Sequence, residues 1–295
     1  MAYYTIARLA KAQGVKLKPK VLPPIYIPPD YEKRLARLYK RVTDLWWQEA
    51  KAHILPAYAN AVAVAREVDK RRAAIQKDDL GTSNIADAAV LLADDLKEGK
   101  DAVNIAAQMA ERVVVALEAA LGMWALSVEA YERGRFVGAV LTATRVDLST
   151  ILHPNDVRTT LEAVLDRNMS LIRNVSDETR QRIADIFFRN YQQRTPLRQV
   201  AKEISEAVGL SRARSLRIAS DQTTKLASAL DEERMKEAGI TKFQWVHSGK
   251  VHFRPEHKAR DGKVYNWATA RSVLKGDLPG VAINCGCKAK AVIDF

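Results

Sequence analysis

The chain has 295 residues, of which 47% are hydrophobic and 28% charged, and its formal net charge is +12 at pH 7. This composition suits a globular protein of about two domains and excludes wholesale disorder. The excess of Lys and Arg fits either an ordinary solvated surface or a polyanionic partner, such as nucleic acid or an acidic protein surface. Two cysteines separated by a single residue do not make the disulfide framework of a secreted protein.

Residues 1–30 are predicted to form an extended, basic, proline-rich arm. Prolines deny a helix its backbone donors and bias the residues before them towards extended conformations. Leu22, Ile25, Tyr26 and Ile27 stand between the prolines. The arm is therefore either a free tail or a segment that docks on a neighbouring subunit. It has no continuous apolar stretch behind its basic residues and is not a signal peptide.

Residues 31–155 are predicted to be a helical region. Asp30 suits an N-cap, and apolar residues then recur at three- and four-residue steps from Leu35 to Trp46. Pro56 should break or kink this run, and further helices are expected at about 57–76, 84–97 and 101–132, with a turn or short helix at 134–148. The longest apolar run, Val113 to Val128, contains Glu118 and is shorter than a membrane span, so we expect a buried helix and no membrane partner.

Residues 156–295 divide into helices over 156–238 and a small module over 239–295. Separate helices are predicted to start at Ser176, Thr195-Pro196 and Ser211, and helices are predicted to end at Gly209 and Gly239. The module then runs through two aromatic strands, a histidine-bearing loop between them, a Pro-Gly turn and a Cys-x-Cys close. The predicted fold class is α+β and mostly α-helical, with long helices and a small C-terminal antiparallel β-containing module.

Within the module, Trp245 and Trp267 are predicted to face the core of the small sheet rather than to stack on nucleotides. Asp261-Gly262 suits a tight hairpin turn that needs positive φ.

An ordered series of motifs carries a family resemblance. It starts at Asn168 to Ile172, continues through Ser211 to Arg214 and Ile218 to Leu226, and ends with the string Gly239-Ile240, Phe243-x-Trp245, Arg254-Pro255-Glu256-His257, Asp261 to Tyr265, Pro279-Gly280 and Asn284-Cys285-x-Cys287. Taken in order, this series resembles the phage Mu F-like minor head proteins, also called phage head morphogenesis proteins. The first 150 residues carry no matching motif.

The resemblance implies a structural component of a tailed-phage virion and no catalysis. Such a protein binds the portal protein, the major capsid protein or other virion proteins during head assembly, and can aid genome packaging or delivery. It is expected in the capsid interior or at the portal vertex, and in the host cytoplasm during assembly. Since only eight residues follow Cys287, we expect no fused toxin domain.

Three soft metal ligands, His257, Cys285 and Cys287, fall within the module. Zinc in structural sites takes four Cys or His ligands. Family members often carry a Cys-x-x-Cys pair where this chain has Arg254 and His257, and a histidine near the position of Ala282. Three alternatives therefore stay open for these residues: a bound zinc ion, buried thiols hydrogen-bonded to His257, and a disulfide. No cofactor is predicted outright. Relatives also often carry Asp where this chain has Lys250, so Arg254 needs another partner, and Asp261 is nearest in sequence.

Enzymes and DNA-binding proteins are two other function classes that the sequence bears on. The sequence has no nucleophile elbow, zinc-protease or phosphate-loop motif, and a nuclease-like metal site at His247, His252, His257 and Asp261 lacks an acidic pair for two metals. The chain is therefore predicted not to be an enzyme. The alternative is a DNA-binding virion protein that contacts packaged double-stranded DNA through phosphates.

Overall fold

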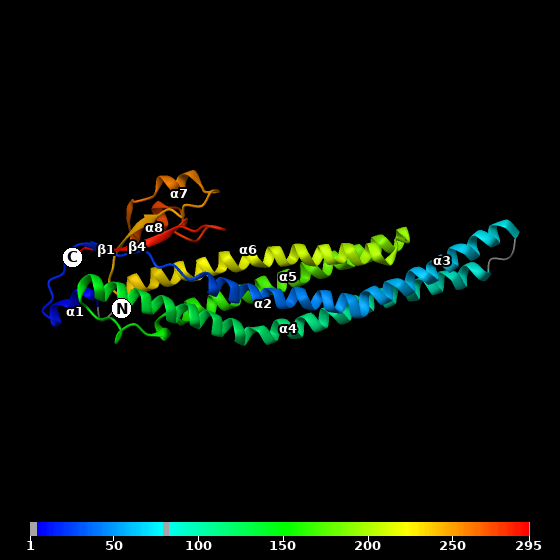
Figure 1. The fold of residues 1–295 in the computed structure, drawn as a ribbon, viewed down its shortest axis with the longest axis horizontal. Helices are drawn as coiled ribbons and strands as arrows, with labels where there is room; N and C mark the ends of the chain where they lie inside the picture. Colours follow the sequence, from blue (N-terminus) through cyan, green and yellow to red (C-terminus); the bar gives the residue numbers. More distant parts are fainter. Residues whose placement is uncertain (1–4, 79–82, 295) are drawn as a thin grey trace. The chain divides into compact units, whose positions relative to one another are not determined.

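The computed structural model describes residues 5–78 and 83–294. The chain is mostly α-helical and has one small four-stranded antiparallel sheet built largely from its C-terminal residues, which confirms the predicted fold class (Figure 1). Its contacts define two compact units, one of residues 1–36, 119–168 and 217–295, and one of residues 37–118 and 169–216. We call them the sheet unit and the helical unit. The domain boundaries predicted after residues 30 and 155 stay predictions.

The helix before residue 78 runs without a break, and a local irregularity marks the place where a break or kink was predicted. Helix α2 (Pro29–Glu49) passes through a π-helical turn, η1 (Ala50–Ile54), into α3 (Leu55–Asp78). Pro56 has no N–H, and its ring would clash with the carbonyl four residues earlier in a regular helix. The wider π turn lies directly before Pro56 and accommodates it, since the Leu55 N–H donates to Ala50 five residues back.

Helix α4 (Ser83–Thr144) is a single helix where the sequence predicted two helices and a turn. Gly134 and Gly138 lie inside it, although each glycine costs about 1 kcal/mol relative to alanine. Phe136 and Val140 next to them are buried in the core of the sheet unit, and this packing outweighs the weak local preference. The helix ends before Arg145, which has φ of 61°.

Part of α4, Lys97–Thr144, is long and apolar enough to cross a membrane by length and composition, with a mean hydropathy of 1.7 over its most apolar window. A helix that packs along one face in a protein core meets the same criteria, and 39% of that window is buried within the protein. The buried positions Val114, Leu117, Leu121, Trp124 and Val128 follow three- and four-residue steps. The predicted buried helix is thus buried on one face.

Helices α5 (Arg158–Gln193) and α6 (Leu197–Glu237) are also longer than predicted, because the predicted starts at Ser176 and Ser211 lie inside them, whereas Thr195-Pro196 does precede α6 as predicted. A short 3-10 turn, η2 (Pro154–Val157), precedes α5. Ser176 accepts a hydrogen bond from the Trp46 indole at 2.9 Å, and the Thr179 and Ser211 hydroxyls lie 2.9 Å apart in the helical unit. These hydroxyls serve contacts between helices, so the predicted helix starts at 176 and 211 and the end at Gly209 are wrong. Gly239, with φ of 75°, does close α6 as predicted.

The sheet has the order β1-β4-β2-β3, with all neighbours antiparallel. Its strands are β1 (Lys20–Val21), β2 (Lys242–Val246), β3 (Val264–Asn266) and β4 (Lys288–Ile293). Two short helices, α7 (Pro255–Ala259) and α8 (Trp267–Val273), flank β3 along the chain.

The N-terminal segment belongs to the core of the sheet unit. A helix, α1 (Ile6–Ala12), precedes the first proline, and β1 pairs with β4. Ile6, Ala10 and Leu22 are buried in the same hydrophobic core as Phe243. The prediction of a wholly extended arm is therefore wrong at residues 6–12, where no proline prevents a helix. The described part of the arm docks on its own chain.

Candidate functional site: a buried cysteine–histidine cluster

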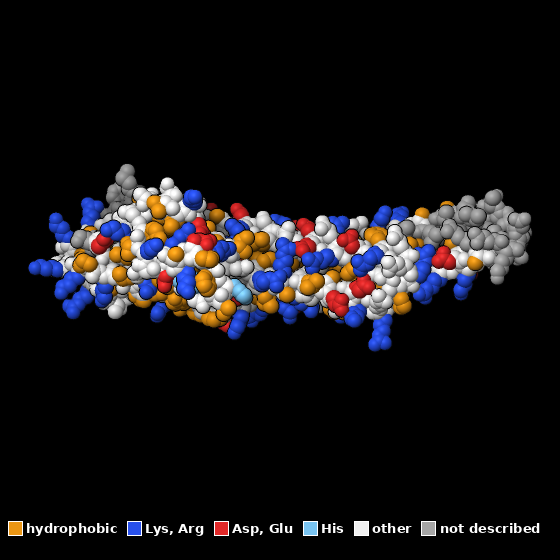
Figure 2. Space-filling view, turned by 90° about the horizontal axis from the view of Figure 1, so that it is seen from above, with side chains coloured by type: hydrophobic (Ala, Val, Ile, Leu, Met, Phe, Trp, Pro, Cys, Tyr) orange, Lys and Arg blue, Asp and Glu red, His pale blue; other side chains and the backbone are white. Residues whose placement is uncertain are grey.

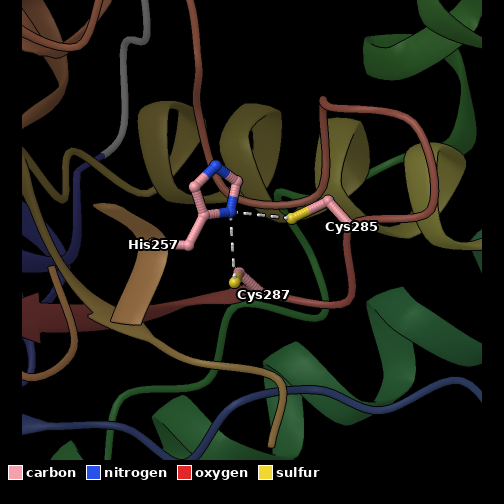
Figure 3. Close-up of side chains that lie close together, drawn as sticks. All are labelled: His257, Cys285 and Cys287. Atoms are coloured by element: carbon pink, nitrogen blue, oxygen red, sulfur yellow. Dashed lines mark hydrogen bonds between the residues drawn. The ribbon is translucent and has the colours of Figure 1, made fainter. Parts of the chain in front are cut away.

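The structure brings together the three predicted ligand residues, His257, Cys285 and Cys287. The Nδ1 atom of His257 lies 3.5 Å from the sulfur of Cys285 and 3.6 Å from that of Cys287 (Figure 3). The three side chains are 2%, 5% and 2% exposed. His257 comes from α7, and the cysteines lie in the segment that leads into β4. We call these three residues the Cys–His cluster.

Asp277 and Arg260 hold the far side of the imidazole. His257 Nε2 lies 2.8 Å from the Asp277 carboxylate, which also accepts a hydrogen bond from Arg260 at 2.6 Å. Burial raises the pKa of Asp277, but hydrogen bonds from Arg260 and His257 outweigh it and leave that pKa below its ordinary value. An ionised carboxylate favours a hydrogen on Nε2, so the lone pair of Nδ1 faces the sulfurs.

The two thiols differ in their protonation. A hydrogen bond from the Cys287 thiol lowers the pKa of Cys285 to about 5; burial opposes this shift, and the backbone N–H groups of Cys287 and Gly280 support it. The same hydrogen bond, together with burial, raises the pKa of Cys287 well above its ordinary value. Since each sulfur shifts the pKa of the other in the opposite direction, the two thiols titrate as a pair.

Helix α6 positions the loop before the cysteines. Asp221 accepts a hydrogen bond from the Asn284 backbone at 2.6 Å, and its other oxygen pairs with Lys225 at 2.6 Å. Asn284 has φ of 58°, a conformation that asparagine tolerates better than most residues. The roles of Asp221 and Asp277 were not predicted from the sequence. Asp221 belongs to the motif series that carries the family resemblance, and this membership is the sequence signal that could have indicated its role. No sequence pattern indicates the role of Asp277.

The two predicted core tryptophans lie in different settings. Trp245 is fully buried in β2, with its ring edge-on to His257 at 5.2 Å and under the Arg260 guanidinium at 5.1 Å. Trp267 begins α8 rather than sitting in a strand, and it is half-buried with its ring 4.1 Å from Phe243. Both indoles therefore pack beside the sheet, as the sequence predicted.

Arg254 does not pair with Asp261, so that expectation is wrong. The Arg254 guanidinium donates to the carbonyl of Ile283, and Lys250 donates to the carbonyl of Asn284. Asp261 instead accepts from the backbone of His247 at 2.8 Å. Both basic side chains therefore tie the loop 247–254 to the segment before Cys285.

Gly262 has the predicted positive φ, 75°, but it lies in the turn that follows α7 rather than in a two-residue hairpin. The turn is still tied to β2, because the Gly262 N–H donates to the Trp245 carbonyl.

The Cys–His cluster supplies three ligand atoms within 4.8 Å of one another, and the described part of the chain adds no fourth His, Cys, Asp or Glu ligand to that group. Arg254 donates to a backbone carbonyl, and the side chain of Ala282 has no atom that could bind a metal ion. A closed structural zinc site needs four ligands, so the donor set does not complete one. His247 and His252 lie outside this group, as does Asp261.

Comparisons with known proteins agree with the motif series. Residues 181–290, which are 110 of the 295, match the family model described as "Phage Mu protein F like protein", which confirms the resemblance. An uncharacterized protein of Haemophilus influenzae (strain Rd) is 28% identical over 153 residues, or 51% of this chain. The chain spans about a third of the length of that curated relative, 34%. No solved structure matches this chain.

Proposed function

We propose that this chain, with its Mu F-like segment at residues 181–290, is a minor head protein that acts in head assembly of a tailed bacteriophage. It works by binding other virion proteins, at the portal vertex or in the capsid interior, and not by catalysis. The observation that carries this proposal is the family match, since head morphogenesis is the role that the Mu F-like family implies.

The burial of the Cys–His cluster supports a structural role. His257 and both cysteines are at most 5% exposed, so a substrate has no access to the sulfurs or the imidazole. The cluster instead connects α7, the start of β4 and, through Asp277, the loop between α8 and β4. A hydrogen-bonded polar cluster of this kind fixes one arrangement of short elements that have little apolar surface of their own.

We further propose that hydrogen bonds, without bound zinc, hold the Cys–His cluster in this chain. The support is the donor count, which is one short of a closed tetrahedral set. Asp277 hydrogen-bonds the far side of the imidazole, and Arg260 pairs with Asp277, so the ring is held in place without a bound ion.

Contact with packaged DNA is the second candidate function, and the net charge of +12 favours it. On the face shown in Figure 2, however, Lys and Arg side chains are scattered with Asp and Glu among them rather than gathered in one patch. Several of the basic side chains also form ion pairs, such as Arg212 with Asp44 and Arg189 with Glu203. This distribution fits general electrostatic attraction better than a dedicated DNA groove.

The test of the proposed function is made on virions. The chain, epitope-tagged in the phage genome that encodes it, should remain in particles washed with 1 M salt at a lower copy number than the major capsid protein. Deletion of its gene should give defective heads or heads that do not become infectious, and the tagged gene supplied in trans should restore them. Normal infectious particles without the chain would refute the assembly role. Loss of the chain from particles in the salt wash alone would favour the DNA-bound alternative.

A further inference from the structure

Two loops of the sheet unit, hydrogen-bonded to each other, expose three large apolar side chains. Val251 and Phe253 belong to the loop 247–254, and Ile283 belongs to the segment before Cys285. These three side chains are 87%, 44% and 68% exposed, respectively. Single exposed apolar residues are ordinary on a protein surface, whereas several on adjoining loops indicate a contact surface. We call these three residues the loop patch.

The two loops hold fixed positions relative to each other. The Arg254 guanidinium donates to the Ile283 carbonyl at 3.2 Å, and the Lys250 ammonium donates to the Asn284 carbonyl at 3.0 Å. The Asn284 N–H in turn donates to Asp221 of α6. The loop patch is therefore ordered before any partner arrives, and an ordered surface loses little conformational entropy on binding.

The ring of Phe253 is also held in place. It lies edge-on to the His247 imidazole, with 5.2 Å between the ring centroids. The Lys258 ammonium of α7 lies 5.1 Å from the centroid of the Phe253 ring. This lysine brings a third positive charge to the loop patch, beside those of Lys250 and Arg254.

The charges around the loop patch are not neutralised within the described part of the chain. Lys250, Arg254 and Lys258 are exposed, and none of them forms an ion pair with a described residue. A carbonyl accepts a hydrogen bond but does not cancel a positive charge. Residues 247–259 contain one acidic residue, Glu256, and residues 279–287 contain none. The loop patch therefore favours a partner that is apolar at its centre and negatively charged around it.

A protein surface meets both requirements better than the other polyanions do. Duplex DNA presents phosphates and has little apolar surface to cover Val251 and Ile283. Segments that lie on anionic membranes use Trp, Phe and Leu, with long basic side chains free to follow the headgroups. Here two of the three apolar residues are β-branched, and carbonyls hold two of the cations at fixed positions. Fixed cations suit carboxylates that are themselves at fixed spacing.

We propose that the loop patch docks a partner protein through an apolar side chain that Asp or Glu residues flank. The apolar side chain covers the loop patch, and the carboxylates pair with Lys250, Arg254 and Lys258. These cations keep their present contacts, because Lys has three N–H donors and Arg has five. The inference concerns this surface alone and does not depend on a role of the chain in a phage head.

Selection of a random twelve-residue peptide library, displayed on yeast, against the immobilised full chain tests the proposal. The enriched peptides should carry Asp or Glu next to Leu, Ile, Val or Phe. Ile283→Ser should weaken binding of the strongest synthetic peptide about tenfold or more, as loss of a central interface side chain does. An increase from 0.05 M to 0.5 M NaCl should also weaken it, because salt screens exposed charge pairs.

Val273→Ser is the matched control. Val273 is 65% exposed, close to the exposed fraction of Ile283, and it lies on α8 outside the two loops. Its replacement should leave the affinity within about twofold. Because both side chains are mostly in solvent, both variants should keep the circular dichroism spectrum of the unaltered chain.

Four results would overturn the proposal. The first is a library that gives no enriched peptide or only peptides without Asp and Glu. The second is an acidic peptide that binds Ile283→Ser as well as the unaltered chain, which would place its site elsewhere. The third is binding to phosphatidylserine vesicles that Ile283→Ser abolishes, which would assign the loop patch to a membrane. The fourth is binding to duplex DNA that the same substitution weakens, which would assign it to nucleic acid.

Discussion

The Asp231 carboxylate lies in an unusual environment for a charged group. Its side chain is buried, it has Glu132 as a like-charged neighbour, and Lys288 compensates it only in part. Such a group lowers the stability of the folded chain at neutral pH, because the folded state must either bury the charge or hold a proton that the unfolded chain releases.

Asp231→Asn is predicted to raise the free energy of unfolding at pH 8 and to leave it nearly unchanged at pH 4. The unfolded chain loses this proton near its ordinary pKa of 3.8, whereas the folded chain keeps it up to about pH 7. Stability of the unaltered protein therefore falls as pH rises from about 4 to about 7. The gain for the variant at pH 8 should be roughly 2–4 kcal/mol, since a tenfold change in proton affinity corresponds to about 1.4 kcal/mol.

Urea unfolding at pH 4 and pH 8, with Glu233→Gln as control, measures this difference. A variant equally or less stable at pH 8 would show that the Asp231 carboxylate is compensated in solution.

For the Cys–His cluster we predict less than about 0.2 zinc per chain after purification from zinc-supplemented medium, because the described chain supplies three ligands and not the four of a structural site. Elemental analysis gives the zinc content. Unfolding with and without EDTA should give the same midpoint. One zinc per chain that is lost in Cys285→Ser would contradict the prediction and would imply a fourth ligand outside this set.

At the scale of elements, the loop between α8 and β4 is held at several points. It contains Asp277, which pairs with His257, the Pro279-Gly280 turn and the approach to both cysteines. Gly280 has φ of 77°, and a Cβ atom built there would collide with the Ser228 side chain of α6. Only glycine permits this approach of loop to helix.

Gly280→Ala is therefore predicted to destabilise the chain by roughly 3 kcal/mol, of which about 1 kcal/mol comes from the positive φ and the rest from the collision. Gly262→Ala is the matched control, because Gly262 has φ of 75° but no atom within 4 Å of the added Cβ. Its cost should be about 1 kcal/mol. Urea unfolding distinguishes the two, and equal costs would mean that the loop moves away from α6 freely.

For the whole molecule, the sheet unit is assembled from distant parts of the sequence. Its core joins Ile6 and Leu22 of the N-terminal segment with Phe136 of α4 and Phe243 of β2. The strand β1 also closes one edge of the sheet by pairing with β4. The Mu F-like segment, residues 181–290, supplies only part of this core.

We predict that residues 156–295 expressed alone do not fold cooperatively. Removal of buried side chains such as Ile6, Leu22 and Phe136 costs about 2–5 kcal/mol each, against a total stability of about 5–15 kcal/mol for a typical domain. Near-ultraviolet circular dichroism should lack the tryptophan signal of the full chain, and co-expression with residues 1–155 should restore it. A fragment with the native signal and a sharp unfolding transition would show that 156–295 is an independent domain.

The sequence by itself determined the fold class, the C-terminal module, the Gly239 helix end and the three residues of the Cys–His cluster. These depend on local signals: helical periodicity, the aromatic strands and an ordered motif series over neighbouring residues. The sequence also predicted the core position of Trp245. Half-buried and buried side chains alternate along β2, and Trp245 is one of the buried ones.

Only the tertiary structure decided where the helices end and what surrounds the cluster. Ser176, Ser211, Gly134 and Gly209 carry local signals for helix ends, but contacts with distant helices and burial of neighbouring apolar residues outweigh about 1 kcal/mol of local preference each. Asp221 owes its role to Asn284, 63 residues away, and Asp277 owes its role to His257, 20 residues away. Pairings over such distances leave no spacing rule in a single sequence, because only folding brings the partners together.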